Sequence, residues 1–188
     1  MKPSEQFQFQ ADSVRTLIAG MTPDQLDDAT PCARWTTRDL LNHLVGGGLM
    51  FGAAFRGEDA DGDHDAPVDL IGDDPGAAWE RAVQSFNVGV DSDGALEREI
   101  PMPWGPTPGA VMLEILKFDV LVHAWDLARA TGQSFDPPAS IVDPLAETAA
   151  QILNDDMRDG DTFADATSPS RAATPMERLA AFTGRSIA

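Results

Sequence analysis

The sequence predicts an all-α protein: a four-helix bundle with one long crossover connection, extra short helices and a short hairpin. Apolar residues recur every three or four positions in most segments, as they do on one face of an α-helix. Glycines and prolines separate these segments at helical lengths. The 188 residues, 43% of them hydrophobic, suffice for one core, so residues 1–188 are assigned to a single domain. The predicted helices span residues 5–19, 36–56, 76–90, 107–131, 138–157 and 176–182.

The first helix ends at Gly20, and a connector with two prolines separates it from the second helix. Thr36 begins the second helix as its N-cap, because Asp39 three residues later completes a capping-box pattern. The glycines at 46–48 cost this helix up to about 1 kcal/mol each relative to alanine. They indicate either the close approach of another helix or room for a ligand one turn beyond His43.

The third helix follows an acidic loop, residues 57–75, that has no helical periodicity. Weak alternation over residues 95–106 then indicates a short strand or hairpin. Thr107 and Pro108 are predicted to begin the fourth helix, with proline at its first position, and Gly132 follows its end. Apolar spacing predicts the last two helices, with a loop between them.

The net charge of −18 is the outlying property of the composition. Proteins bind nucleic acids largely through Lys and Arg, and anionic membrane surfaces repel acidic proteins. We therefore expect neither a nucleic-acid nor a membrane partner, and we interpret the acidity as a solubilising surface. Cys32 is the single cysteine, which excludes an internal disulfide. With no apolar secretory signal at the start of the sequence, we expect a cytoplasmic location.

Three polar side chains lie on helix faces that the apolar spacing marks as buried. Asp119 and His123 are four residues apart on the fourth helix, so they share one face. His43 lies on the core-facing side of the second helix. Burying an unpaired polar group costs roughly 2–7 kcal/mol on transfer scales, so each of these groups needs a strong partner. The apolar neighbours of Asp119 and His123 on their stripe are Met112, Ile115, Leu116 and Val122.

Ordinary hydrogen bonds could satisfy each group taken alone. His43 could bond to a carbonyl or a carboxylate, and Asp119 to His123 within their helix. Taken together, two imidazoles and a carboxylate form a ligand set for zinc, and equally for nickel or ferrous iron. Three protein ligands leave a coordination position open, which is typical of catalytic or ligand-exchanging sites. We therefore predict a divalent metal, with zinc preferred, on His43, Asp119 and His123.

Three other residues could belong to this site. Asp126 is expected to support a ligand histidine by accepting a hydrogen bond, or else to bond Trp35 or a helix end. Cys32 is interpreted as a half-buried packing residue, since a nucleophile would need a cation that stabilises its thiolate. His64, the third histidine, lies in the acidic loop and is interpreted as solvated.

Three segments carry a resemblance to a known family: TPCARWTTRDLLNHL at 30–44, HAWDLARATG at 123–132 and TPMERLAAFTGR at 174–185. They resemble an actinobacterial family of metal-binding proteins. That family is similar to the N-terminal domain of mycothiol-dependent maleylpyruvate isomerase and belongs to the wider DinB-like superfamily of four-helix bundles. The resemblance extends over nearly the whole chain and implies a DinB-like bundle.

The resemblance also implies a ligand set. In the isomerase a histidine on the second helix and a Glu-x-x-x-His pair on a later helix hold the metal, which correspond to His43 and to Asp119 with His123. Aspartate stands at position 119 where the isomerase has glutamate, so this ligand arm is shorter. We expect no counterpart of the additional C-terminal domain of the isomerase.

Three functions follow as hypotheses. The first is a metal-dependent thiol transferase or isomerase, in which mycothiol occupies the open position and attacks an electrophilic small molecule. The second is a non-catalytic metal-binding, small-ligand-binding or regulatory module. The third, weaker hypothesis is a metal-dependent hydrolase that uses a bound hydroxide. The sequence leaves the oligomeric state open, with a homodimer as one alternative.

Overall fold

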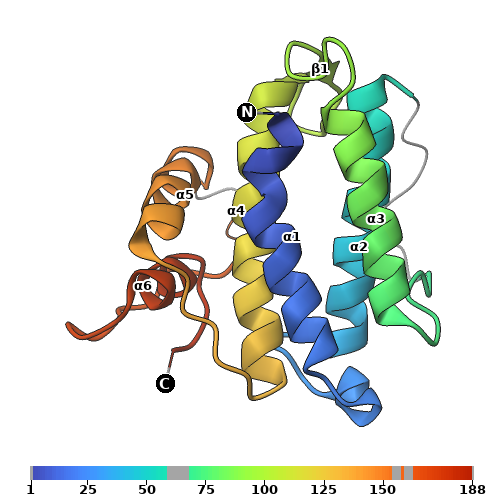
Figure 1. Ribbon diagram of the computed structural model, residues 1–188. Helices are drawn as coiled ribbons and strands as arrows, with labels where there is room; N and C mark the ends of the chain where they lie inside the picture. Colours follow the sequence, from blue (N-terminus) through green and yellow to red (C-terminus); the bar gives the residue numbers. More distant parts are fainter. Residues whose placement is uncertain (1, 59–67, 154–157, 159–162, 188) are drawn as a thin grey trace.

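The computed structural model describes residues 2–58, 68–153, 158 and 163–187 (Figure 1). Its four long helices form a bundle, which confirms the predicted fold class. They are α1 (Pro3–Ala19), α2 (Thr37–Arg56), α3 (Pro75–Val90) and α4 (Gly109–Ala130). Both α1 and α2 pack on α3 and on α4. None of the described helices is long and apolar enough to cross a bilayer.

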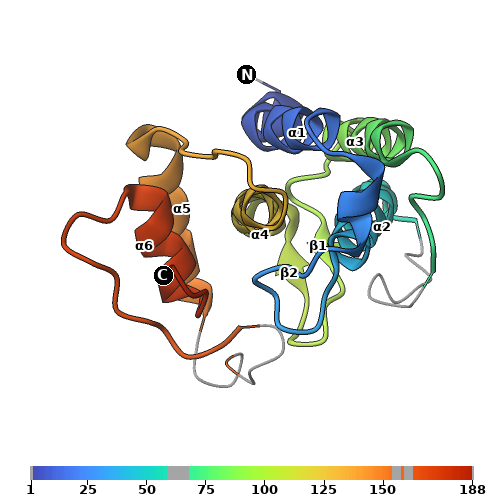
Figure 2. The same ribbon diagram turned by 90° about the horizontal axis from the view of Figure 1, so that it is seen from below.

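The shorter elements pack against α4, except for the first of them, which packs against α2. They are the 3-10 helix η1 (Pro23–Asp27), the strands β1 (Glu99–Ile100) and β2 (Thr107–Pro108), and the helices α5 (Ala139–Ile152) and α6 (Pro175–Phe182). Figure 2 shows α4 between the rest of the bundle and the pair α5–α6. The core accordingly has one part within the bundle and another between α4, α5 and α6. As a result, residues 120–128 of α4 are all buried.

The capping box predicted for α2 is present. The Thr36 hydroxyl accepts the Asp39 N–H at 3.3 Å, and an Asp39 carboxylate oxygen accepts the Thr36 N–H at 2.9 Å. After the last residue of α4, Gly132 has a φ of +68°, as its position after the helix predicts.

The predicted start of α4 is wrong by two residues. Thr107 and Pro108 form β2, which pairs antiparallel with β1, and the helix begins at Gly109. The backbone N–H of Gly109 donates to the Arg98 carbonyl at 2.8 Å, so hydrogen bonds to the β1 segment continue up to the first residue of the helix. The predicted hairpin is therefore confirmed, but its second strand lies just beyond the segment assigned to it.

Two predictions fall partly or wholly outside the described residues. The described part of the fifth helix ends at Ile152, and residues 154–157 of its predicted span lie outside. His64 and the rest of segment 59–67 in the acidic loop also lie outside.

The glycines of α2 and α3 set how closely these helices pack. A Cβ atom on Gly48 would lie 2.9 Å from the Ala82 Cβ, and one on Gly52 would lie 2.6 Å from the Ser85 Oγ. Gly47 differs, because a Cβ atom there would have no neighbour within 4 Å. The two explanations given for the glycines at 46–48 thus apply to different residues. Another helix approaches closely at Gly48, and there is open space at Gly47.

Candidate metal centre

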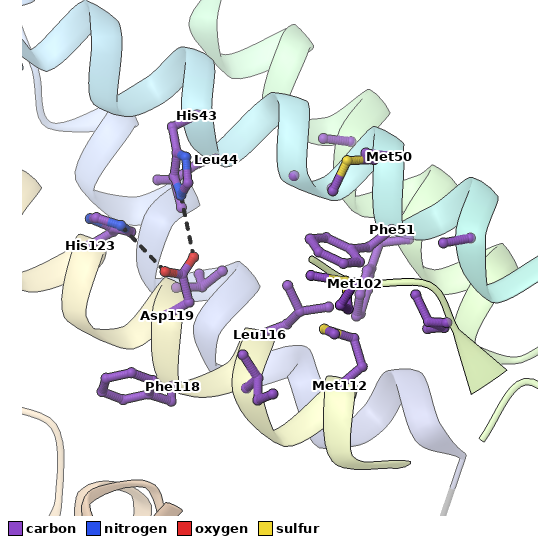
Figure 3. A pocket seen from close by; sticks show the side chains of 18 of the residues that line it. His43, Leu44, Met50, Phe51, Met102, Met112, Leu116, Phe118, Asp119 and His123 are labelled. Carbon is purple, nitrogen blue, oxygen red and sulfur yellow. Dashed lines mark ion pairs between the residues drawn. The ribbon is translucent and has the colours of Figure 1, made fainter. Parts of the chain in front are cut away.

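The side chains of His43, Asp119 and His123 converge between α2 and α4 (Figure 3). Asp119 lies between the two imidazoles. Its Oδ2 is 3.5 Å from the His43 Nε2, and its Oδ1 is 3.5 Å from the His123 Nε2. Each residue therefore offers one donor atom, and all three atoms lie within 4.8 Å of one another.

These separations fit a bound metal better than direct hydrogen bonds. An N–H···O hydrogen bond usually spans about 2.7–3.2 Å. Zinc–ligand bonds of about 2.0–2.2 Å place two tetrahedral ligands about 3.4 Å apart. The 3.5 Å spacing on both sides of Asp119 is close to that edge length. The donor atoms present are thus of the right kind and spacing to hold a divalent cation.

Asp126 fixes the orientation of the His123 ring. The Nδ1–H of His123 donates to the Asp126 Oδ2 at 3.0 Å, since the carboxylate can only accept. With the proton on Nδ1, the neutral imidazole directs the lone pair of Nε2 toward Asp119. A carboxylate behind a histidine is the usual support of a metal-binding imidazole.

Arg185 balances the charge of Asp126. Its Nη2 lies 2.8 Å from the Asp126 Oδ2 and its Nε lies 3.2 Å from Oδ1, so the contact is bidentate. Burial raises the pKa of Asp126, but the charge and hydrogen bonds of Arg185, together with those of His123, outweigh burial and bring this pKa to about 2. The sequence pattern did not identify Arg185 as part of the site. Two observations could have identified it: a buried carboxylate needs a cation, and this arginine belongs to the C-terminal motif that carries the family resemblance.

The metal-free centre favours positive charge at His123. Burial lowers the pKa of this imidazole, but the charge of Asp119 and hydrogen bonds to Asp119 and Asp126 raise it well above its usual value. The pKa of Asp119 is held well below its usual range by the same pairing, against the effect of burial. Without a metal, a proton on His123 supplies the positive charge between two carboxylates. A divalent cation would satisfy the same electrostatic need.

Cys32 forms a second group of potential donors with His123 and Asp126. The half-buried thiol donates to the Asp126 Oδ2 at 3.2 Å, and its sulfur lies 3.9 Å from the His123 Nδ1. The Arg185 Nη2, however, lies 3.5 Å from this sulfur and also bonds Asp126. Because the guanidinium already occupies this side with positive charge, the Cys32 group is a poor place for a cation.

Trp35 covers the two histidines. Its ring centroid lies 4.8 Å from that of His43 and 5.6 Å from that of His123. The turn that carries it is fixed by a bridge between Ala29 and Thr36 and by the Trp35 N–H, which donates to the Cys32 carbonyl at 2.9 Å. The connector before α2 is thus an ordered part of the site.

A large cavity, here called the chamber, extends from the candidate centre into the bundle, with a volume of about 860 Å³. Met112, Ile115 and Leu116 line it, in agreement with the predicted stripe. Val122 does not belong to this stripe, because it packs in the core shared with α5 and α6. Figure 3 shows apolar side chains of α2, α4 and the hairpin gathered beside the three polar residues.

Comparisons with known proteins place these residues in a wider context. The family model described as the mycothiol maleylpyruvate isomerase N-terminal domain matches residues 7–128, a span that contains His43, Asp119 and His123. Two proteins of Mycobacterium tuberculosis, uncharacterized protein Rv0738 and uncharacterized protein MT0763, are each 34% identical over 190 residues, covering 100% of both chains.

Two solved structures are similar in fold. The crystal structure of the mycothiol-dependent maleylpyruvate isomerase aligns with a TM-score of 0.60 at 19% identity. That of a mutant with one histidine replaced by alanine aligns with a TM-score of 0.59 at 15% identity. Each alignment covers 77% of this chain and 66% of the isomerase chain, so this chain spans slightly less than two thirds of the isomerase.

Proposed function

The chain belongs to the family of mycothiol maleylpyruvate isomerase N-terminal domains, and from this premise we propose a divalent-metal protein that acts on a low-molecular-weight thiol. The printed names of the structural relatives make mycothiol the first candidate thiol. The observation that carries the proposal is the convergence of three donor atoms, from His43, Asp119 and His123, at one end of the chamber.

His43 and His123 would hold the metal through Nε2, and Asp119 through a carboxylate oxygen. Two imidazoles and a carboxylate suit zinc first, with nickel and ferrous iron as alternatives. The bound cation would supply a site that keeps a thiol as its thiolate at neutral pH. Asp126 holds the His123 ring in place, while Trp35 shields both imidazoles from solvent on one side.

Metal analysis of protein purified without a histidine tag tests the ligand set. We expect near-stoichiometric metal in the wild type and loss of most of it in His43→Ala, because that variant removes the only ligand from α2. His64→Ala is the matched control, since it also removes one of three histidines but none of the proposed ligands. Equal metal content in wild type and His43→Ala would refute the site.

Cobalt substitution tests the thiol. The visible spectrum of cobalt-loaded protein should change on addition of mycothiol if the thiol reaches the metal, and the melting temperature should rise through ligand linkage. Mycothiol that leaves both the spectrum and the melting temperature unchanged would refute the thiol-dependent function, whatever the metal content.

A non-catalytic binding module is the second candidate, and one observation favours it. Among the described residues that line the chamber, the ionisable ones besides the proposed ligands are Cys32 and Arg34. The described lining therefore offers no further imidazole or carboxylate as a general base. Thiol consumption by metal-loaded protein with a panel of electrophiles separates the two functions, because a binding module would bind the thiol without consuming it.

A further inference from the structure

The chamber is apolar beyond the candidate metal centre. Helices α2, α3 and α4 surround it with aliphatic, aromatic and thioether side chains, among them Leu44, Phe51, Trp79, Phe86, Met112 and Leu116. Its volume of about 860 Å³ is within the range of small-molecule sites, which is roughly 300–1,000 Å³. The chamber is therefore large enough for a molecule that extends well past the three polar residues.

Beyond the candidate metal centre, the charges around the chamber offer no second anchor for an anionic group. Carboxylates in protein sites are usually held by Arg or Lys. Among the described lining residues the only permanent cation is Arg34, whose side chain lies exposed at the rim. The net charge of −18 adds a field that repels anions from the whole surface. A dicarboxylate could place one carboxylate at the centre, but its second carboxylate would find little compensation for the water it loses.

We propose that this chamber binds an uncharged molecule with an extended apolar body, whose single polar end lies at His43, Asp119 and His123. The inference rests on the proposed function, because it assigns the chemical class of the compound that meets the thiol. The ligand is thus a neutral lipophilic compound rather than a dicarboxylate.

Gly47 marks where the apolar body passes the centre. It lies one turn beyond His43 on the chamber side of α2, and a Cβ atom there would meet no atom within 4 Å. Met50, Met102 and Met112 line the adjoining part of the chamber (Figure 3). Methionine side chains adapt to different apolar shapes, so this region can accept bodies of varied form.

The rim of the chamber is also suited to apolar molecules. Its exposed lining residues come from the connector before α2, at Ala33 and Arg34, and from the hairpin, at Pro101, Pro103 and Trp104. Trp104 is 59% exposed, yet its indole N–H donates to the Thr107 hydroxyl at 3.1 Å. A large aromatic ring is thus held at the entrance, where an apolar ligand would first make contact.

Calorimetric titration with straight-chain primary alcohols, from butanol to decanol, tests the proposal on metal-loaded protein. We expect each added methylene to raise the affinity roughly fourfold until the chamber is filled, with a negative heat-capacity change of binding. Maleate and succinate should bind much more weakly than decanol, because their second carboxylate would lie in the apolar part of the chamber. Affinity that is independent of chain length, or binding of the dicarboxylates as tight as that of decanol, would overturn the proposal.

Substitution of Gly47 locates the binding. Gly47→Leu fills the open space beside the centre, so decanol affinity should fall at least tenfold, and metal analysis of the same sample shows whether the centre is intact. Gly47→Ala should reduce decanol affinity by a smaller factor. It keeps the test valid if the leucine variant fails to fold, because its side chain is smaller. Ala150→Leu, on the exposed face of α5 and outside the chamber lining, is the control. Decanol affinity that is equal in wild type and Gly47→Leu would refute the chamber as the site.

The outcomes separate this inference from the proposed function. Chain-length-dependent binding without any response to mycothiol would support the apolar chamber and refute the thiol-dependent function. A response to mycothiol without chain-length dependence would support the thiol-dependent function and overturn the apolar chamber.

Discussion

Asp126 shows how one buried carboxylate organises the candidate metal centre. Its side chain is fully buried, and it bonds His123, Cys32 and Arg185. The position of Asp126 three residues after His123 could be read from the sequence, because helical spacing places both side chains on one face. Its partner Arg185, 59 residues further along the chain, could not, because no local pattern specifies which cation reaches a buried carboxylate.

The pairing of Arg185 with Asp126 leads to a stability prediction. Arg185→Met leaves the Asp126 carboxylate buried without its main counter-ion, which typically costs about 3–5 kcal/mol. Urea denaturation of metal-free protein measures the loss. Arg171→Met is the control, since Arg171 is exposed and the same substitution there should change the stability by less than about 0.5 kcal/mol. A similar loss in both variants would contradict the prediction.

At the scale of elements, α2 carries glycines in two different environments. Gly48 and Gly52 let α3 approach closely, whereas Gly47 borders open space in the chamber. The sequence alone indicated that some packing or binding role must offset the cost of these glycines to the helix. It did not indicate which of them contacts another helix. That assignment depends on the rotation of α2 about its axis, which packing against α3 and α4 decides.

Alanine substitutions at adjacent glycines should therefore have opposite effects. Gly47→Ala should stabilise the protein by about 1 kcal/mol, because alanine is the better helix former and its methyl group meets no atom. Gly48→Ala should destabilise it by about 1–3 kcal/mol, because the Cβ would lie 2.9 Å from the Ala82 Cβ and 3.3 Å from the Ala82 carbonyl. Thermal and urea unfolding measure both, and effects of the same sign would contradict the assignment.

The element boundaries show where sequence patterns suffice. The start of α2 was predictable because Thr36 and Asp39 form a capping box from residues three apart. The start of α4 was not, because Pro108 is as compatible with a strand end as with the first turn of a helix. Pairing with β1 decides in favour of the strand, and that pairing joins residues on opposite sides of a loop.

At the scale of the whole molecule, α4 is the shared wall of two cores. Phe118 and Leu121 pack toward α5 and α6, while Met112 and Leu116 face the bundle. The apolar pattern predicted one amphipathic stripe on this helix. Because partners on both sides bury α4, apolar residues surround it, and Val122 falls on the side away from the chamber.

The net charge of −18 predicts a dependence of stability on ionic strength. Repulsion among surface carboxylates opposes the compact state, and salt screens it as the Debye length falls from about 30 Å to about 3 Å. Sodium chloride should therefore raise the melting temperature, by about 2–4 °C for each kcal/mol gained. Scanning calorimetry at several salt concentrations measures the effect, with sucrose at matched osmolality as the uncharged control. A melting temperature that does not rise with salt would contradict the prediction.

The contact of Arg185 with Asp126 also sets the order in which the centre can be completed during synthesis. All three proposed donor residues lie within the first 123 positions, and helices α1 to α4 are complete at Ala130. The guanidinium that steadies the Asp126–His123 pair, however, comes from Arg185, which follows α6 and is translated well after the bundle. A nascent or prematurely terminated chain can thus build the bundle with its histidine ring poorly held. The finished centre therefore reports that translation has passed α6.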